Sequence, residues 1–272
     1  MRPDIQIAFI GSGTMGEAMI SGLLAKKVVT ADQIIASDPI ESRRLYMQQT
    51  YAVRTTSKNT EAIQGSAIVV LSVKPQVLGA LMPTLRGKIA SDTLVMSIVA
   101  GASIPSLSQG LNHTPIVRAM PNTPAQVGMG MTVWSASPEV TEVQHSYTKT
   151  ILQALGEEMA VPHEQDIDRA TALSGAGPGF VFLLIEAAID AGVHMGFTRA
   201  QAQTLTLQTI AGSVELMRQT NDHPTLLRNR VTSPGGATAV GLYQLEKAGI
   251  RTAICDAVFA TFERTQKLGN FN

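Results

Sequence analysis

The segment SPGGAT, residues 233–238, combines residue types that can bind an anion. Apolar residues at helical spacing follow it, which predicts a helix over residues 234–248. Ser233 is a good N-cap residue, and Pro234 suits the first helical position. Glycine in a first helical turn costs up to about 1 kcal/mol relative to alanine, so two of them need a reason. Small side chains there leave uncovered the backbone N–H groups of Gly235, Gly236, Ala237 and Thr238.

The start of this helix therefore predicts a site for a carboxylate or a phosphate. Free N–H groups and the positive end of the helix dipole both attract an anion there. Thr238 adds a hydroxyl, which can donate and accept hydrogen bonds beside the anion. The alternative interpretation is that the glycines only allow tight packing at the start of the helix.

A second chemical motif, GSGTMG, occupies residues 11–16. It follows a short apolar strand pattern at residues 5–10 and precedes a helical pattern. In this context Gly11 makes the tight turn, Gly13 admits the pyrophosphate of a dinucleotide, and Gly16 lets the helix pack on the strand. The helix N-terminus then faces the phosphates. The motif predicts a dinucleotide-binding site.

Strand patterns alternate with helical segments along the first half of the chain. Residues 33–37 form the second strand pattern. The runs 67–73 and 93–101 are continuously apolar, as expected for central parallel strands covered on both faces. Residues 115–120 and 131–135 are further strand candidates. The predicted fold class is α/β, with an N-terminal Rossmann-like doubly wound sheet and an all-α C-terminal domain.

Two features beyond these strands bear on the cofactor, because ligands of such sheets bind beyond the carboxyl ends of the strands. Asp38 ends the second strand, where an acid normally takes the ribose 2′-hydroxyl of NAD and repels a 2′-phosphate. Arg43 and Arg44 lie just beyond and could serve a phosphate, or they are surface charges on the next helix. Lys74 is either a general acid or a solvated residue whose backbone lines the nicotinamide pocket. Pro75, which fixes the turn, favours the second role.

The second half of the chain predicts helices alone. Strand patterns largely stop after residue 164, so the predicted domains are a dinucleotide-binding domain, 1–164, and a helical substrate-binding and dimerisation domain, 165–272. Residues 177–196 are apolar nearly all round, which implies burial on several sides. One copy offers too little surface to cover this helix, so we expect an obligate oligomer. Further helices are predicted over residues 199–219, 224–231, 234–248 and 251–268.

Composition excludes several classes of protein. Of 272 residues, 21 are Lys or Arg and 21 are Asp or Glu, so nothing suggests binding to nucleic acid or to a charged membrane surface. The five histidines show no metal-ligand spacing, which predicts no metal site. Cys255, the single cysteine, excludes an intrachain disulfide and is expected to be buried. The N-terminus is typical of a strand and not of a signal peptide, so we expect a cytoplasmic protein.

Together these residues resemble the pyrroline-5-carboxylate reductases, which catalyse the last step of proline synthesis. The resemblance runs essentially end to end. It rests on FIGSGTMG, LSVKPQ, SIVAG, VRAMPNTPA, ALSGAGPGFVF and HP…SPGGAT. The glycine motif alone is common to many enzymes, whereas RAMPNTP, SGAGP and SPGGAT are specific. The resemblance implies NADPH- or NADH-dependent reduction of the C=N bond of 1-pyrroline-5-carboxylate to L-proline, by a Rossmann domain and a helical dimerisation domain.

The resemblance also implies which residues bind, and a dimer or a larger assembly such as a decamer. Implied cofactor contacts are Gly11, Ser12, Gly13, Thr14, Met15, Gly16, Ser37, Asp38, Asn59, Ser72, Val73, Lys74, Pro75, Ile98, Val99 and Ala100. Implied substrate contacts are Glu164, Ser233, Gly235, Gly236, Ala237 and Thr238. Thr238 is the implied catalytic group, which donates the proton or orients the ring nitrogen. Some members carry a cofactor-binding asparagine where this chain has Arg230, so that contact is not expected.

The chemistry of this reaction fits the residues. A cyclic imine with a carboxylate needs an anion site, a hydride donor and a proton on nitrogen. The imine can enter protonated, so Thr238 need only orient its N–H. Two alternatives remain open. One is a related Rossmann reductase acting on a hydroxy acid or another imine, and the other is a non-catalytic NAD(P)-sensing module.

Overall fold

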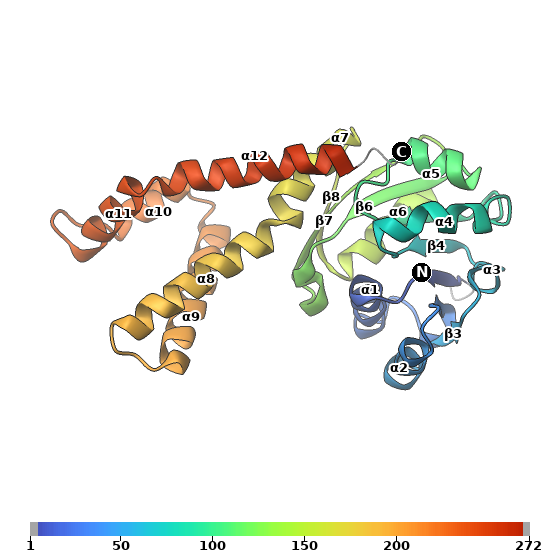
Figure 1. Ribbon diagram of the computed structural model, residues 1–272, viewed down its shortest axis with the longest axis horizontal. Helices are drawn as coiled ribbons and strands as arrows, with labels where there is room; N and C mark the ends of the chain where they lie inside the picture. The colour runs from blue at the N-terminus through green and yellow to red at the C-terminus, as the bar shows by residue number, and fades with distance from the viewer. Residues whose placement is uncertain (1–4, 269–272) are drawn as a thin grey trace. The chain divides into compact units, whose positions relative to one another are not determined.

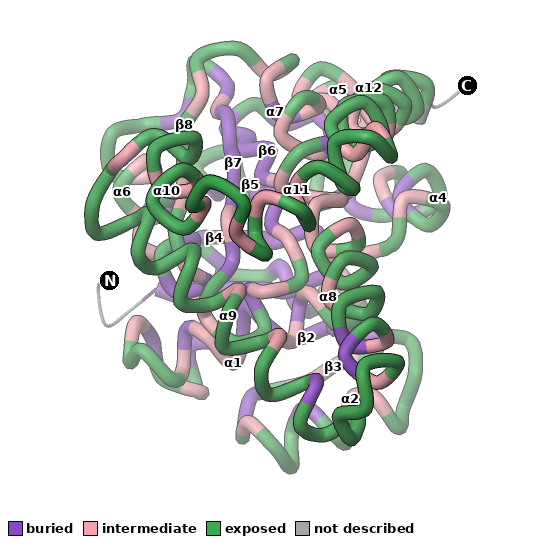
Figure 2. Tube along the Cα trace, turned by 90° about the vertical axis from the view of Figure 1, so that its left-hand side faces the viewer, coloured by how far each residue is buried: buried purple, intermediate pink, exposed green. Residues whose placement is uncertain are grey.

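The computed structural model describes residues 5–268 (Figure 1). The chain divides into two compact units. The first contains the residues up to Ala176 together with those from Thr261 onward, and the second contains Gly177–Ala260. Buried residues are concentrated in the sheet of the first unit, whereas helices α8 to α11 of the second are largely exposed (Figure 2).

The first unit is built on an eight-stranded sheet with the order β3-β2-β1-β4-β5-β6-β7-β8. Neighbours are parallel, except that β7 runs antiparallel to β6. In the central register, Ile7 pairs with Ile34 on one side and with Ile68 on the other. The strands are β1 (Ile7–Ile10), β2 (Ile34–Ser37), β3 (Arg54–Thr56), β4 (Ile68–Leu71), β5 (Leu94–Ser97), β6 (Ile116–Met120), β7 (Gly130–Ala136) and β8 (Gly156–Ala160).

Hydrophobic clusters cover both faces of the sheet, and the apolar strands lie at its centre because their side chains are buried on both faces. In β1, Ile7 and Phe9 belong to one hydrophobic cluster, and Ala8 and Ile10 belong to the cluster on the other face. The helices of this unit are α1 (Thr14–Ala25), α2 (Glu41–Tyr51), α3 (Asn59–Ala62), α4 (Pro75–Leu85), α5 (Ile104–Leu111), α6 (Glu142–Gln153) and α7 (Gln165–Ala170), with short 3-10 helices η1 (Ala31–Gln33) and η2 (Thr123–Val127).

The second unit is helical, as predicted. A π-helical turn (Thr171–Gly175) at the end of the first unit precedes it. The helices are α8 (Gly177–His194), α9 (Arg199–Thr220), α10 (Pro224–Arg230), α11 (Ala237–Lys247) and α12 (Ile250–Leu268), whose end belongs to the first unit. Close packing joins α8 to α9, since a Cβ added at Gly192 would lie 2.8 Å from the Cβ of Ala202.

Helix α8 exposes most of its apolar residues within one chain. Phe182 is 61% exposed and Leu183 is 65% exposed. By length and composition, the helical stretch Gln165–His194 is also apolar enough to cross a membrane. The expected burial of α8 is therefore not achieved by this chain alone.

Two expectations in the second unit were wrong. Helix α11 begins at Ala237 instead of residue 234, because Gly235 has φ +70° and Gly236 is the N-cap residue. Residues 233–236 thus form a turn before the helix, and Ser233 is not its cap. Cys255 is exposed rather than buried, since its face of α12 has no covering element within the described chain.

Candidate active site

The glycine motif forms the tight turn that its sequence predicts. Gly11 has φ +94°, which favours glycine, and its N–H donates to the carbonyl of Ser37 at 2.8 Å. A Cβ at this position would lie 2.9 Å from the carbonyl oxygen of Ser72. The turn therefore brings β1, β2 and β4 together at the carboxyl edge of the sheet.

Glycine is required at position 16 for close packing, and at position 13 it leaves open space above the loop. A Cβ at Gly16 would lie 2.7 Å from the carbonyl oxygen of Gly11, so the helix packs directly on the turn. The Ser72 hydroxyl donates to that same carbonyl at 2.6 Å. At Gly13, the N-cap residue of α1, an added Cβ would meet no atom within 4 Å. This open approach to a helix N-terminus fits a dinucleotide pyrophosphate.

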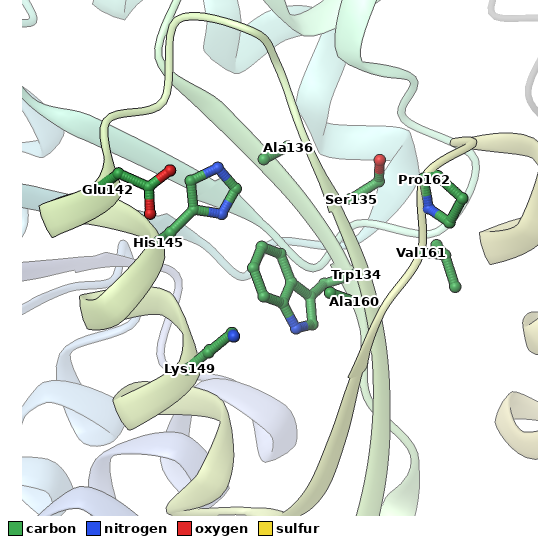
Figure 3. A pocket seen from close by; sticks show the side chains of 9 residues that line it. All are labelled: Trp134, Ser135, Ala136, Glu142, His145, Lys149, Ala160, Val161 and Pro162. Atoms are coloured by element: carbon green, nitrogen blue, oxygen red, sulfur yellow. The ribbon is translucent and has the colours of Figure 1, made fainter.

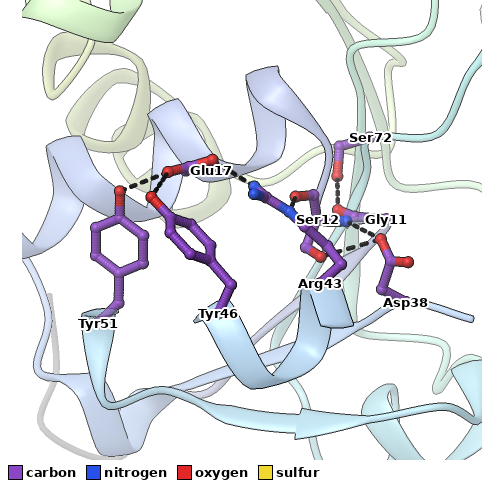
Figure 4. Close-up of polar contacts among 8 residues, drawn as sticks. All are labelled: Gly11, Ser12, Glu17, Asp38, Arg43, Tyr46, Tyr51 and Ser72. Carbon is purple, nitrogen blue, oxygen red and sulfur yellow. Dashed lines mark hydrogen bonds and ion pairs between the residues drawn. The ribbon is translucent and has the colours of Figure 1, made fainter. Parts of the chain in front are cut away.

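Asp38 is 8% exposed, and its carboxylate is directed into the protein (Figure 4). One oxygen, Oδ2, accepts hydrogen bonds from the N–H and the hydroxyl of Ser12, both at 3.0 Å. The other oxygen accepts from the N–H of Ile40 at 3.0 Å. The carboxylate therefore fixes the glycine loop to the end of β2.

Arg43 lies over the same loop and belongs to a polar cluster (Figure 4). Its Nε donates to the carbonyl of Ser12 at 2.5 Å, and its Nη2 forms an ion pair with Glu17. The hydroxyls of Tyr46 and Tyr51 donate to Glu17 at 2.9 and 2.8 Å. Burial tends to raise the pKa of Glu17, but the hydrogen bonds from Arg43 and the tyrosines outweigh it, and the pKa lies below its usual value.

Other predicted cofactor residues also gather at the ends of the strands. The Ser37 hydroxyl donates to Oδ1 of Asn59 at 2.6 Å. Lys74 is exposed and precedes α4, of which Pro75 is the first residue. This is consistent with a role for the Lys74 backbone. Ile98, Val99 and Ala100 follow β5 directly.

Glu164 is held by a buried arginine. Arg118, 5% exposed, donates from Nη1 to Oε1 of Glu164 at 3.0 Å and from Nη2 to Oδ1 of Asp168 at 2.6 Å. The N–H of Ile104 also donates to Oε1 of Glu164, at 2.7 Å. These contacts support a structural role for Arg118. Asp168 was missed because no local pattern marks it.

The turn of residues 233–236 leaves some amides free and uses another. The N–H of Gly236 donates to the carbonyl of Ser233 at 3.0 Å, so it is not available to an anion. Within the described chain, the N–H groups of Gly235, Ala237 and Thr238 have no hydrogen-bond partner. Four free amides were expected, and three are observed, because the turn closes one hydrogen bond of its own.

Two regions of the chain match known families. Residues 164–268 match the family described as pyrroline-5-carboxylate reductase dimerisation. Residues 6–101 match the family described as NADP oxidoreductase, coenzyme F420-dependent. The pyrroline-5-carboxylate reductase of Synechocystis sp. is 45% identical over 266 residues, covering 98% of this chain and 99% of that protein. That of Methanosarcina acetivorans is 37% identical over 265 residues, covering 97% and 98%.

The chain belongs to the pyrroline-5-carboxylate reductase family. Its fold agrees with a crystal structure of the pyrroline carboxylate reductase of Plasmodium falciparum with NADP bound, at a TM-score of 0.91 and 32% identity. That match covers 99% of this chain and 100% of the other. The predicted family, fold class, NAD(P)H-dependent enzyme class and cofactor class are thereby confirmed.

The exposed apolar surface of α8 lies inside the region of this reductase that matches the dimerisation family. That match supports self-association of the chain. The predicted oligomer is confirmed to that extent.

A separate cavity of about 330 Å³ lies at the edge of the sheet in this reductase (Figure 3). It is placed between α6 and the strands β7 and β8, and it contains none of the predicted site residues. Its walls are formed by Trp134, Ser135, Ala136, Glu142, His145, Lys149, Ala160, Val161 and Pro162. The cavity is therefore separate from the predicted site.

Proposed function

We propose that this chain reduces the C=N bond of 1-pyrroline-5-carboxylate to L-proline with NADPH or NADH. The single observation that carries the proposal is the turn at 233–236, whose free amides lie in the helical unit of a chain that also has a complete dinucleotide loop. The loop accounts for the cofactor, and the turn accounts for the carboxylate of the substrate. A dinucleotide sensor would need only the first of these.

The cofactor site consists of the residues named from the sequence. Gly11, Gly13 and Gly16 shape the loop, and the other contacts follow the ends of β2, β4 and β5. When bound, NADPH or NADH supplies the hydride to the ring carbon of the imine. Asn59 contributes by way of its hydrogen bond with Ser37, and Asp38 contributes by fixing the loop.

The substrate carboxylate binds at the turn before α11. The free N–H groups of Gly235, Ala237 and Thr238 donate to it, and the hydroxyl of Ser233 lies on the same turn. Each hydrogen bond to a charged acceptor contributes about 1.5–3 kcal/mol. Two or three such bonds exceed the roughly 1–2 kcal/mol of helix propensity that the glycines cost. Gly236 allows the turn to close.

The ring nitrogen needs a proton, and the chain supplies orientation rather than a strong acid. The imine enters protonated, and the Thr238 hydroxyl accepts its N–H, which holds the ring in one orientation. Glu164 is a second substrate contact. Its Oε1 is already occupied by Arg118 and Ile104, while its Oε2 has no partner among the described residues, which supports a role for that oxygen.

The proposed domain boundary lies at residues 164 and 165. The dimerisation match begins at residue 164, which supports this boundary, whereas the compact units divide after Ala176. We further propose that the dimers can assemble into a decamer, that the enzyme is cytoplasmic, and that it binds neither nucleic acid nor a membrane. The equal numbers of acidic and basic residues support the last statement.

Single-turnover NAD(P)H oxidation tests the proposed function. Purified protein is mixed with NADPH or NADH and then with 1-pyrroline-5-carboxylate or with a keto acid of similar size. We expect oxidation with the imine and none with the keto acid. Oxidation with the keto acid alone would favour the related reductase, and binding without oxidation of either kind would favour the sensing module.

A further inference from the structure

We propose that Arg43 selects NADPH over NADH by binding the 2′-phosphate of the adenosine ribose, while Asp38 serves the glycine loop instead of the ribose. This inference rests on the proposed function, since it names the preferred cofactor of the same site. It is carried by the contacts of two side chains that lie beyond the end of β2 (Figure 4).

Asp38 does not present the carboxylate that an NAD-binding site requires. In that kind of site an acid at the end of the second strand accepts hydrogen bonds from the ribose hydroxyls. Here both oxygens already accept hydrogen bonds, from Ser12 and from the N–H of Ile40, and the residue is 8% exposed. A ribose would therefore have to share a largely covered carboxylate with the contacts that hold the glycine loop.

Unlike the Asp38 carboxylate, the Arg43 guanidinium keeps one nitrogen free for a ligand. Its Nε and Nη2 are held by the carbonyl of Ser12 and by the carboxylate of Glu17. Its Nη1 has no hydrogen-bond partner within the described part of the chain. A guanidinium fixed on two sides with its third nitrogen free loses little conformational entropy when it binds a phosphate oxygen.

The surroundings of Arg43 keep the guanidinium in this place. The carbon Cζ lies 5.0 Å from the centre of the Tyr46 ring, within the range of a cation–π contact. Glu17, which pairs with Nη2, is itself held by the hydroxyls of Tyr46 and Tyr51. Because Nε bonds to a carbonyl of the glycine loop, Arg43 lies beside the region where the adenosine ribose of a dinucleotide binds.

The neighbouring arginine provides a matched control. Arg44 donates from Nη1 to the carbonyls of Asp38 and Pro39, at 2.8 and 2.9 Å. It carries the same charge one residue further along α2, but it contacts neither the glycine loop nor Glu17 among the described residues. A general effect of positive charge would appear in both arginines, whereas a specific phosphate contact belongs to Arg43 alone.

The test is a binding titration of the full-length protein with NADPH and with NADH, followed by the fluorescence of the nucleotide. Replacing Arg43→Ala should weaken NADPH binding about 10- to 100-fold, as expected for a lost hydrogen bond to a charged partner. The same change should alter NADH binding by less than about threefold. Arg44→Ala should change the ratio of the two dissociation constants by less than about threefold.

A competition experiment tests the 2′-phosphate directly. Adenosine 2′,5′-bisphosphate should compete with NADPH better than 5′-AMP does, and Arg43→Ala should abolish this difference.

Arg43→Gln gives the same test if the alanine variant does not fold, because a glutamine side chain can still donate to the carbonyl of Ser12. Equal weakening of NADPH and NADH binding by the Arg43 variants would overturn the inference and make Arg43 a structural residue of the loop. Selective loss of NADPH in Arg44→Ala would overturn it too. These titrations contain no imine, so they stand apart from the reductase assay: a protein that fails to reduce the imine contradicts the proposed function, and the binding result still decides this inference.

Discussion

Thr238 is the residue on which the proposed chemistry depends most. It stands in the first turn of α11 with a free N–H, next to two other free amides. Thr238→Ala keeps the backbone N–H and removes only the hydroxyl. We expect kcat/KM for the imine to fall roughly 10- to 100-fold, the effect of one hydrogen bond to a charged partner. Steady-state kinetics measures this, and Thr238→Ser should recover most of the loss; an alanine variant with normal kcat/KM would exclude the hydroxyl.

The ionisation of Tyr51 is expected to lower the stability of the first unit at alkaline pH. Burial, and then the hydrogen bond to Glu17, raise the pKa of Tyr51 from 10.0 to about 12. The folded state therefore holds the phenolic proton more tightly than the unfolded state. This contribution to stability is complete below about pH 10 and is lost as the pH rises from about 10 to about 12.

The prediction concerns Tyr51→Phe, which removes the titrating hydroxyl. Urea unfolding should show a variant less stable by about 0.5–1.5 kcal/mol at pH 8, because one hydrogen bond is lost. Between about pH 10 and pH 12 its stability should fall less steeply than that of the wild type. Tyr147→Phe removes a hydroxyl elsewhere in the first unit and serves as the control. Parallel pH profiles for wild type and Tyr51→Phe would show that the Tyr51 proton is not linked to folding.

Residue contacts could be predicted from the sequence only where a local sequence motif encodes them. The roles of Gly11 and Gly16 followed from the motif, and the close approaches to Ser72 and Gly11 bear them out. The contacts of Glu17 with Arg43 and of Arg118 with Asp168 join residues 26 and 50 positions apart. No local pattern encodes such pairs, because the fold brings them together.

At the scale of elements, the turn before α11 shows why two glycines precede this helix. Gly235 adopts φ +70°, a conformation that costs other residues about 1–2 kcal/mol. A Cβ at Gly236 would lie 2.5 Å from Oγ of Ser233. From the sequence, we expected the glycines to leave the amides bare, with tight packing as the alternative. The structure adds a backbone reason for each glycine. Both reasons keep the three free amides in place.

Gly236→Ala should therefore damage the carboxylate site by displacing Ser233. We expect a higher KM for the imine, unchanged NADPH binding, and weaker protection by proline in a thermal shift assay, since a ligand stabilises the state that binds it. Gly79→Ala lies in α4, where an added Cβ meets no atom within 4 Å, and should change none of these. Proline binding as tight as in the wild type would mean that the glycines serve packing and that the anion binds elsewhere.

The strands illustrate how far periodicity predicts elements. All six strands predicted from the sequence are present. The runs 67–73 and 93–101 were the clearest, because central parallel strands buried on both faces are continuously apolar. The two missed strands, β3 and β8, end the sheet on either side and have the polar sequences RTT and GEEMA. An edge strand needs fewer apolar residues, so it leaves no such pattern.

At the scale of the whole molecule, the exposed apolar face of α8 predicts that the chain is stable only as an assembly. Sedimentation velocity at micromolar concentration should show dimers or larger assemblies, because the apolar residues of α8 are exposed in one chain. Leu183→Asp, at a position 65% exposed in the chain, should increase the monomer fraction and reduce activity. Val143→Asp, 50% exposed on α6, is the matched control and should leave the assembly unchanged. A stable, active monomer of the wild type would contradict this.

The most direct test of the account follows the hydride itself. NADPH that carries deuterium at the transferred position of the nicotinamide is incubated with the enzyme and 1-pyrroline-5-carboxylate, and the product is analysed by mass spectrometry and NMR. We expect L-proline with one deuterium, on the ring carbon that was double-bonded to nitrogen in the imine. Proline without deuterium, or deuterium found only in a reduced keto acid, would contradict it.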